Sequence, residues 1–270
     1  MPDQLSLELP TEPPNLPWGL RPMLARPYPT PFDSPNHVFQ PLWGGLRVLA
    51  FVGGSGPPRS AHALAQSDPA RSARGLALLD PDGVDRIGHF PELGAVRDQL
   101  AAGSAVLDGE IVVVDRAGRL DANGLAARLA GRPGVAGRPG PPAVFLAFDL
   151  LHLDGRSLLG APLHRRRDLL RRLVGPGGAV LVVPAVEADG RALHAAVVAQ
   201  GLAGVLARLR TSPYLPGVRS RLWRFVPARP PADADLGSTS EATAGAPFEE
   251  PSLPAAPVLA VFSRLPLDTL

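Results

Sequence analysis

The sequence predicts an α+β domain whose sheets are largely antiparallel. Short runs of apolar and β-branched residues recur along the chain, and only a few segments show the spacing of an amphipathic helix. The 270 residues are 45% hydrophobic, which is enough for a sizeable core. No run approaches the roughly 20 apolar residues that a membrane span needs. Many strands interspersed with few helices are typical of an α+β fold.

The predicted strands follow from local patterns. Residues 111–114 are β-branched throughout, which predicts a strand. Gly44 and Gly45 separate two apolar runs and predict a β-hairpin between them. Asp80-Pro81-Asp82-Gly83 and Asp154-Gly155 have the composition of turns that end strands. In chain order, strands are expected at 38–43, 47–52, 76–79, 106–115, 144–151, 180–183, 205–209 and 222–226, with a loop or a weak helix at 53–75 and a loop at 132–142.

The predicted helices are fewer and shorter. Pro91 suits the first position of a helix, and Leu93, Val96 and Leu100 follow it at helical spacing. Residues 164–174 form a basic amphipathic helix with its leucines facing inward. Helices are therefore expected from Pro91, at 164–174 and at 191–202.

The chain divides into three segments of different charge. Residues 1–20 are Pro-rich, carry a net charge of −3 and are expected to be extended. Residues 21–226 carry +9 and form the predicted domain. Residues 227–270 carry −4, are rich in Pro and Ala, and are expected to be mostly disordered, with a short strand at 258–266 left open. These 44 residues are too few for an oligonucleotide-binding barrel, so no such domain is expected after the predicted one.

Two missing residue types exclude whole classes of chemistry. All 27 basic residues are arginine, and the chain contains no lysine. An arginine guanidinium has no free lone pair, so no side-chain amine is available as a nucleophile. The absence of cysteine excludes disulfides, thiolate zinc sites and cysteine nucleophiles. The six histidines show no His-x-x-x-His pair, which disfavours zinc. With no secretory signal pattern, the sequence favours a cytoplasmic protein, associated with the nucleoid if it binds DNA.

Several segments in order resemble one family. The first two are Arg21-Pro22-Met23-Leu24-Ala25 and Phe39-Gln40-Pro41-Leu42-Trp43-Gly44-Gly45-Leu46-Arg47. Leu107-Asp108-Gly109-Glu110 and Phe148-Asp149-Leu150-Leu151 follow, and then Gly201-Leu202-Ala203-Gly204-Val205. Their order across residues 21–226 resembles the adenylation (nucleotidyltransferase) domain of ATP-dependent DNA ligases of the bacterial repair and end-joining type. The resemblance implies ATP and Mg²⁺ as the family cofactors and a ligase-like fold.

The departures from the family pattern fall where its chemistry lies. The resemblance implies a lysine that attacks the α-phosphorus of ATP, and that position is Leu42. Two residues further on, the family has an aspartate where this chain has Gly44. The family glutamate that contacts adenine is replaced by Gln40. Pro81 replaces an arginine, and Ala203 replaces a glutamate implicated in metal binding. No catalytic residue is therefore predicted.

Other family positions keep a related side chain. The resemblance implies that Gln40 and Arg47 belong to a vestigial nucleotide pocket, with Arg47 pairing with an anion or closing a buried ion pair. Glu110 would take a ribose hydroxyl or a metal ion. Phe148 would stack on adenine, although a phenylalanine on a buried strand is also an ordinary core residue. Arg208 replaces a lysine and keeps its charge.

Arginines outside this pocket are candidates for binding phosphate or DNA. Two phosphate-contacting lysines of the family fall on Phe225 and Pro227, and shifting the alignment by one residue brings Arg224 there. Arginines on the 164–174 helix could also bind phosphate, although a solvated helix face explains them as well. The candidates for phosphate or DNA contact are Arg165, Arg166, Arg171 and Arg224.

Three functions remain open at this point. The first is a catalytically inactive pseudo-ligase that binds double-stranded or nicked DNA, or another repair protein. The second is an active ligase with unconventional or complemented chemistry. The third is an interaction scaffold that binds neither ATP nor DNA. The basic body with acidic ends suits a polyanion partner, and the acidic ends are expected to compete with DNA for the basic surface.

Overall fold

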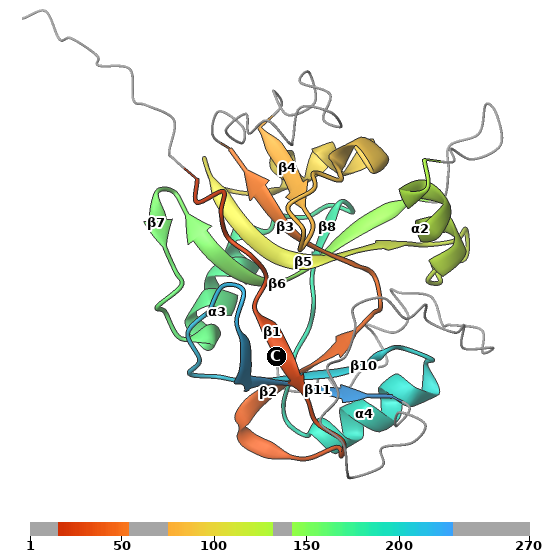
Figure 1. The fold of residues 1–270 in the computed structure, drawn as a ribbon, viewed down its shortest axis with the longest axis vertical. Coiled ribbons are helices and arrows are strands. Elements are labelled where there is room, and N and C mark those ends of the chain that lie inside the picture. The colour runs from red at the N-terminus through yellow and green to blue at the C-terminus, as the bar shows by residue number, and fades with distance from the viewer. Residues whose placement is uncertain (1–15, 54–74, 132–141, 229–270) are drawn as a thin grey trace, which may run out of the picture.

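The computed structural model describes residues 16–53, 75–131 and 142–228, which form two β-sheets with short helices around them (Figure 1). Sheet A has five strands in the order β1-β11-β10-β2-β9. Its strands are β1 Leu24–Pro27, β2 Ser34–Leu42, β9 Val186–Ala188, β10 Gly204–Leu209 and β11 Arg219–Pro227.

Sheet B has six strands in the order β4-β3-β5-β6-β7, with β8 pairing with β6. Its strands are β3 Leu46–Val52, β4 Leu76–Leu79, β5 Ala105–Val113, β6 Ala143–Leu153, β7 Arg156–Ser157 and β8 Val180–Val182. Within the described residues, the pairs β1–β11 and β6–β8 are parallel and the other strand pairs are antiparallel. The prediction of an α+β fold with largely antiparallel sheets is confirmed.

The helices differ in part from those predicted. The segment from Pro91 is helical, but with 3₁₀ geometry, and it still buries Leu93 and Val96. Helix α2 was not predicted, although its first turn has a recognisable cap: the Asp121 side chain accepts a hydrogen bond from the Gly124 amide at 2.7 Å. The helices are the 3₁₀ segments η2 Ile87–His89 and η3 Pro91–Gln99, with α2 Ala122–Leu129, α3 Leu163–Leu173 and α4 Gly190–Ala199.

The predicted hairpin across Gly44 and Gly45 is wrong. The two flanking strands exist, but β2 belongs to sheet A and β3 to sheet B, so the glycines carry the chain from one sheet to the other. A Cβ on Gly45 would lie 2.4 Å from the Ile111 carbonyl oxygen, and Gly44 has a φ of +77°. The two glycines thus permit a close crossing. The hairpin did not form because β2 pairs with β10 and β9, while β3 pairs with β4 and β5.

Other local predictions are confirmed. Strand β4 has the predicted bounds. The Asp80 carboxylate accepts hydrogen bonds from the backbone amides of Asp82 and Val84, at 3.0 and 2.9 Å, and so closes the predicted turn. Asp154 and Gly155 both have positive φ values and join β6 to β7, as a tight hairpin turn requires. Most of the predicted loops at 53–75 and 132–142, and nearly all of the tail, lie outside the described residues.

The core lies on both faces of sheet B and extends to sheet A. Each residue of β5 is buried, in agreement with the apolar residues at both ends of the strand, and its two buried acids, Asp108 and Glu110, lie between them. One core cluster packs β3, β5 and β6 against η3 and α3, and includes Phe90, Phe145 and Leu170. A second joins sheet A to α4 through Phe39 and Val197 and contains Phe148. Charged side chains are buried beside these clusters, and several come from the predicted pocket.

Candidate functional site

The structure brings together three of the positions where the sequence departs from the family pattern. Leu42 is the last residue of β2 and pairs with Gly204 of β10, and its carbonyl oxygen accepts a hydrogen bond from the Ala203 amide at 3.1 Å. A Cβ on Gly44 would lie 3.6 Å from the Ala203 Cβ. Leu42, Gly44 and Ala203 therefore form one neighbourhood at the crossing between the sheets. None of the three side chains can attack phosphorus or bind a metal ion.

Glu110 lies on β5 next to this crossing and is bound to the chain itself. Its carboxylate accepts a hydrogen bond from the Gly45 amide at 3.0 Å and another from the Trp43 amide. The side chain is buried. Burial raises the pKa of Glu110 to about 7, against the opposing effects of Arg47 and the two backbone amides. The group that was predicted to take a ribose hydroxyl or a metal ion instead holds the crossing loop.

Arg47 of β3 closes an ion pair with a fully buried carboxylate, although 21% of its own side chain is exposed, and an ion pair is one of the two roles predicted for it. Its Nε and Nη2 atoms donate to the two carboxylate oxygens of Asp108, at 2.7 and 2.8 Å. The Tyr214 hydroxyl donates to the same carboxylate at 2.7 Å and accepts from the Met23 amide. Burial opposes the charge on Arg47, but Asp108 more than offsets this and raises the pKa of the guanidinium. This network ties the segment before β1 to sheet B.

Phe148 lies in the core between the sheets with arginines around it. Only 4% of its surface is exposed, and the guanidinium carbons of Arg47 and Arg208 lie 4.5 and 5.0 Å from its ring centroid. The predicted alternative of an ordinary core residue therefore describes its present surroundings. An adenine base would reach this ring only after the arginines had moved.

Arg208 of β10 is fully buried and incompletely paired. Its Nη2 donates to the Phe148 carbonyl oxygen at 3.1 Å, and its Nη1 lies 3.7 Å from Asp149. The Nε and Nη1 atoms make no hydrogen bond within the described residues. Burial lowers the pKa of Arg208 to about 10, although Asp149 and Asp108 act in the opposite direction. The positive charge predicted here is present, but it is enclosed.

Arg166, a predicted phosphate or DNA contact, does not lie at the surface. Arg166 is fully buried and forms a bidentate ion pair with Asp149 of β6, with both N–O distances 2.8 Å. Arg167 is also buried, and it donates to the carbonyl oxygens of Phe148 and Val183. Burial lowers the pKa of Arg167 to about 9. Both arginines lie at helical spacing from Leu163 and Leu170, on the face of α3 that packs on β6. That spacing was the signal that could have excluded them from the surface.

The other predicted phosphate contacts are accessible to different degrees. Arg165 and Arg171 are exposed on α3, and Arg171 pairs with Asp168 at 2.7 Å. Arg224 is partly exposed on β11, and its guanidinium lies over the rings of Tyr28 and Phe32 at 4.6 and 5.1 Å.

Gln40 joins β2 to the segment after β8 instead of presenting a free amide. Its Nε2 donates to the carbonyl oxygens of Val183 and Pro184, at 3.0 and 3.3 Å. Among the described residues, no group of three His, Cys, Asp or Glu side chains could hold a metal ion. The donor set at the crossing therefore does not fit a bound Mg²⁺, because its carboxylate is engaged by backbone amides.

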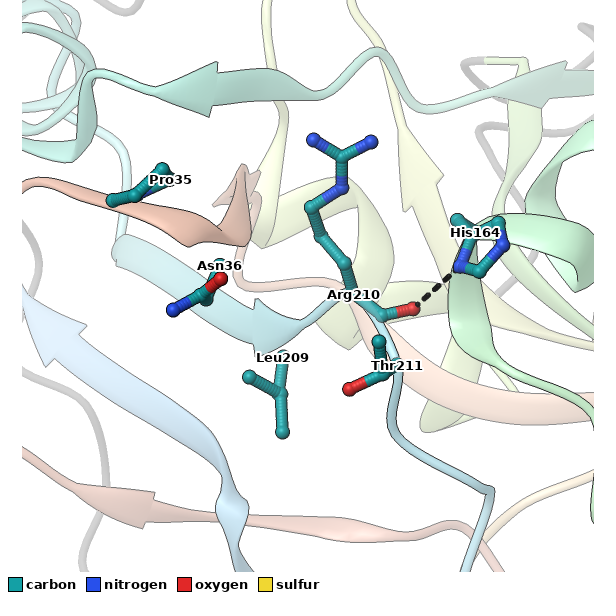
Figure 2. A pocket seen from close by; sticks show the side chains of 6 residues that line it. All are labelled: Pro35, Asn36, His164, Leu209, Arg210 and Thr211. Atoms are coloured by element: carbon teal, nitrogen blue, oxygen red, sulfur yellow. Dashed lines mark hydrogen bonds between the residues drawn. The ribbon is translucent and has the colours of Figure 1, made fainter.

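A separate open cavity of about 530 Å³ lies at the opposite end of the β2–β10 ladder from Leu42 (Figure 2). The His164 Nδ1 lies 3.1 Å from the Arg210 carbonyl oxygen, which the His164 amide also contacts. Because a carbonyl only accepts, Nδ1 must carry the proton in this contact. The sequence analysis did not point to this cavity. Its lining residues are Pro35, Asn36, His164, Leu209, Arg210 and Thr211.

Two sheets that meet at the Leu42 crossing, with Arg47, Glu110 and Phe148 on adjacent strands of sheet B, define a ligase-type nucleotidyltransferase fold. The family model described as "ATP dependent DNA ligase domain" matches residues 82–224. The chain belongs to this family, and the resemblance stated from the sequence is confirmed.

Relatives and solved structures agree with this assignment. The chain is 34% identical to DNA ligase C1 of Mycolicibacterium smegmatis over 223 residues, covering 79% of this chain and 57% of that protein. It is 38% identical over 142 residues to the "Multifunctional non-homologous end joining DNA repair protein LigD" of Mycobacterium tuberculosis, covering 52% of this chain and 17% of the relative. The crystal structure of the ligase domain of M. tuberculosis LigD superposes with a TM-score of 0.59 at 27% identity, covering 78% of this chain and 60% of that one. The chain thus spans 17% to 57% of the length of these curated relatives. No helix of the described residues has the length and apolar character needed to cross a membrane.

Proposed function

We propose that this chain is a non-catalytic member of the ligase family that binds duplex DNA in DNA repair. The absence of catalysis is inferred from one observation: Leu42, Gly44 and Ala203 lie next to one another at the crossing between the sheets. At this place the family chemistry requires an amine nucleophile with carboxylates beside it. The chain offers one leucine and two of the smallest residues, and it has no lysine anywhere.

The lost groups act on the same step, so their losses combine. Without an amine lone pair, no bond to the α-phosphorus of ATP can form at position 42. Without metal-binding carboxylates, the charge that develops on the phosphates is not neutralised. Each such electrostatic contribution is typically worth about 3–4 kcal/mol of transition-state stabilisation. Glu110 does not compensate, because its carboxylate is bound to the Gly45 and Trp43 amides.

Binding to DNA is supported by charge and by the relatives. Residues 21–226 carry a net charge of +9, and arginine suits phosphate because its planar group donates two parallel hydrogen bonds. The relatives described above include proteins named for DNA ligation and end-joining repair. Contact with DNA would be mainly electrostatic and indifferent to sequence. The alternative partner, another repair protein, is supported by no specific contact surface among the described residues.

Two measurements on the full chain test the proposal. The first is incubation with α-labelled ATP and Mg²⁺, followed by a denaturing gel, with a sealing-competent ligase run in parallel. We expect no covalent adduct, and an acid-labile AMP adduct on this chain would establish an active ligase instead. The second is fluorescence anisotropy with a nicked duplex over a range of salt concentrations. We expect binding that weakens steeply with salt, and no binding even at low salt would favour a scaffold that does not bind DNA.

A further inference from the structure

The edge of sheet A formed by β1 and β11 carries an unusual concentration of arginine. The residues around these two strands, 16–32 and 211–228, contain five arginines and neither aspartate nor glutamate, and Asp33, which follows, pairs with Arg191 of α4. We call this surface the arginine edge. It consists of Arg21, Arg26, Arg219, Arg221 and Arg224.

Parallel pairing of the two strands brings arginines from distant parts of the chain next to each other. Leu24 pairs with Arg219, and Arg26 pairs with Arg224. The Arg219 guanidinium donates to the Ala25 carbonyl oxygen of the neighbouring strand at 2.8 Å. In Figure 1, β1 and β11 lie close together near the centre of the view, below sheet B. In the part of the chain that the structure describes, β1 is an edge strand of sheet A, and no further strand covers its outer side.

Among the described residues, no acidic side chain pairs with an arginine of this edge, whereas other surface arginines do have an acidic partner. Arg171 pairs with Asp168 on α3, and Arg210 pairs with Glu187. On the arginine edge the contacts are different in kind. Arg21 donates to the Pro81 carbonyl oxygen at 3.1 Å. Arg224 lies over aromatic rings.

Two like charges on directly paired strands weaken the pairing of a sheet. Arg26 and Arg224 are such a pair, and no acid of either strand relieves their repulsion. A polyanion would relieve it. Phosphates along a DNA backbone offer the closely spaced negative charges that a row of arginines neutralises, with release of condensed counterions.

We propose that the arginine edge is the surface through which this chain contacts the phosphate backbone of duplex DNA. This inference rests on the proposed function and adds the location of the interface. It also assigns the exposed arginines of α3, Arg165 and Arg171, to solvent. The rings of Tyr28 and Phe32 hold the Arg224 guanidinium in place, which reduces the conformational entropy lost when it meets a phosphate.

The test compares two double variants of the full chain with the same loss of charge. Arg26 and Arg221 are exposed, and neither side chain has a hydrogen bond or an ion pair within the described residues. The same is true of Arg165 and Arg172 on α3, which serve as the control. The variants are Arg26→Gln/Arg221→Gln and Arg165→Gln/Arg172→Gln. Circular dichroism melting of both verifies that they are folded.

The readout is the slope of log affinity against log salt for a nicked duplex, measured by anisotropy. Arg26→Gln/Arg221→Gln is expected to reduce the magnitude of this slope by about 1.8, because each phosphate contact contributes about 0.9. Arg165→Gln/Arg172→Gln is expected to keep the slope of the parent chain. Equal reductions in both variants, or none in the first, would overturn the assignment of the interface while leaving DNA binding intact. If the parent chain does not bind the duplex at low salt, the proposed function itself fails.

Discussion

The Glu110 carboxylate accepts a hydrogen bond from the Gly45 amide at 3.0 Å, so a central strand of sheet B holds the loop that follows Leu42. Only glycine fits at position 45 without a shift of the backbone, because a Cβ there would lie 2.4 Å from the Ile111 carbonyl oxygen. This hydrogen bond joins the loop between the two sheets to β5.

Substitution of Glu110 by Gln should alter the pH dependence of stability. Burial raises the pKa of Glu110 to about 7 in the folded chain, compared with 4.5 for an unperturbed glutamate. Between these values the folded state binds the proton more tightly than the unfolded state, so the parent loses stability as pH rises through this window. The difference between the two pKa values corresponds to a loss of about 3 kcal/mol in the free energy of unfolding across this pH range. Glu110→Gln lacks this titration, so its stability relative to the parent should rise from pH 4.5 to 7 and stay constant above.

Urea unfolding of both chains at several pH values measures this difference. Asp98→Asn, which removes an exposed carboxylate on η3, is the control for a general effect of charge. A difference between parent and Glu110→Gln that did not change with pH would show that Glu110 titrates normally.

Restoring the amine at position 42 should not restore ligation. Leu42→Lys supplies the missing nucleophile at the end of β2, but Gly44 and Ala203 remain beside it without a carboxylate. The rate of AMP transfer should therefore stay below detection in the labelled-ATP assay, and nicked DNA should remain unsealed. Measurable sealing by this single variant would mean that the neighbouring losses matter little.

Arg166 should be far more important for stability than its neighbour Arg165. Arg166→Met leaves Asp149 buried with only the more distant Arg208, at 3.7 Å. Breaking a buried pair on one side typically costs about 3–5 kcal/mol of unfolding free energy. Arg165→Met removes an exposed charge and should cost less than about 0.5 kcal/mol. Urea unfolding measures both.

A second variant keeps this prediction testable if Arg166→Met does not fold. Arg166→Lys keeps a positive charge opposite Asp149 and should lose clearly less stability than Arg166→Met, because the buried carboxylate stays paired. Equal, small effects of Arg166→Met and Arg165→Met would contradict the role of the buried pair.

Neutralising the acids of residues 227–270 should strengthen DNA binding. These residues carry a net −4 and follow β11, which contributes three arginines to the arginine edge. A full-length variant with all six acids changed to their amides should bind a nicked duplex more tightly at low salt. The gain should shrink near physiological salt, because the screening length falls from about 30 Å at 0.01 M to about 8 Å at 0.15 M. Fluorescence anisotropy at these two salt concentrations measures the affinity. Weaker or unchanged binding at low salt would contradict competition between the acidic residues and DNA for the basic surface. The six acids are Asp233, Asp235, Glu241, Glu249, Glu250 and Asp268.

Much of the secondary structure could be predicted because it depends on local chemistry. The β-branched run at 111–114 lies in and just after β5, and the Asp80–Gly83 turn closes on its own side chain. Two short strands of sheet A, β1 and β9, were missed. Each has only three or four residues and is held by its partner strand rather than by its own pattern. The hairpin was wrong for a related reason: adjacent strands can pair with more distant ones.

For the candidate site, too, the sequence identified positions but not the contacts that their side chains make. The sequence identified the positions of Leu42, Glu110 and Arg208 by their order along the chain. It could not show that Glu110 binds backbone amides, since these come from a loop 65 residues away. Nor did its description of the 164–174 helix as basic separate Arg166 from Arg165.

The sequence by itself determined that no lysine amine can act as a nucleophile in this chain, because the absence of lysine is a property of composition that no fold can change. It also determined the family, through the order of its motifs. Only the tertiary structure decided where the positive charge lies. Arg47, Arg166, Arg167 and Arg208 are held inside by pairing with Asp108 and Asp149, by hydrogen bonds to carbonyl oxygens and by aromatic rings. The arginines of β1 and β11 remain outside, where strand pairing alone brings them together. Arginines with the same formal charge differ in this way because burying a charge is tolerable only where opposite charges and acceptors meet it, and the fold supplies these at some positions and not at others.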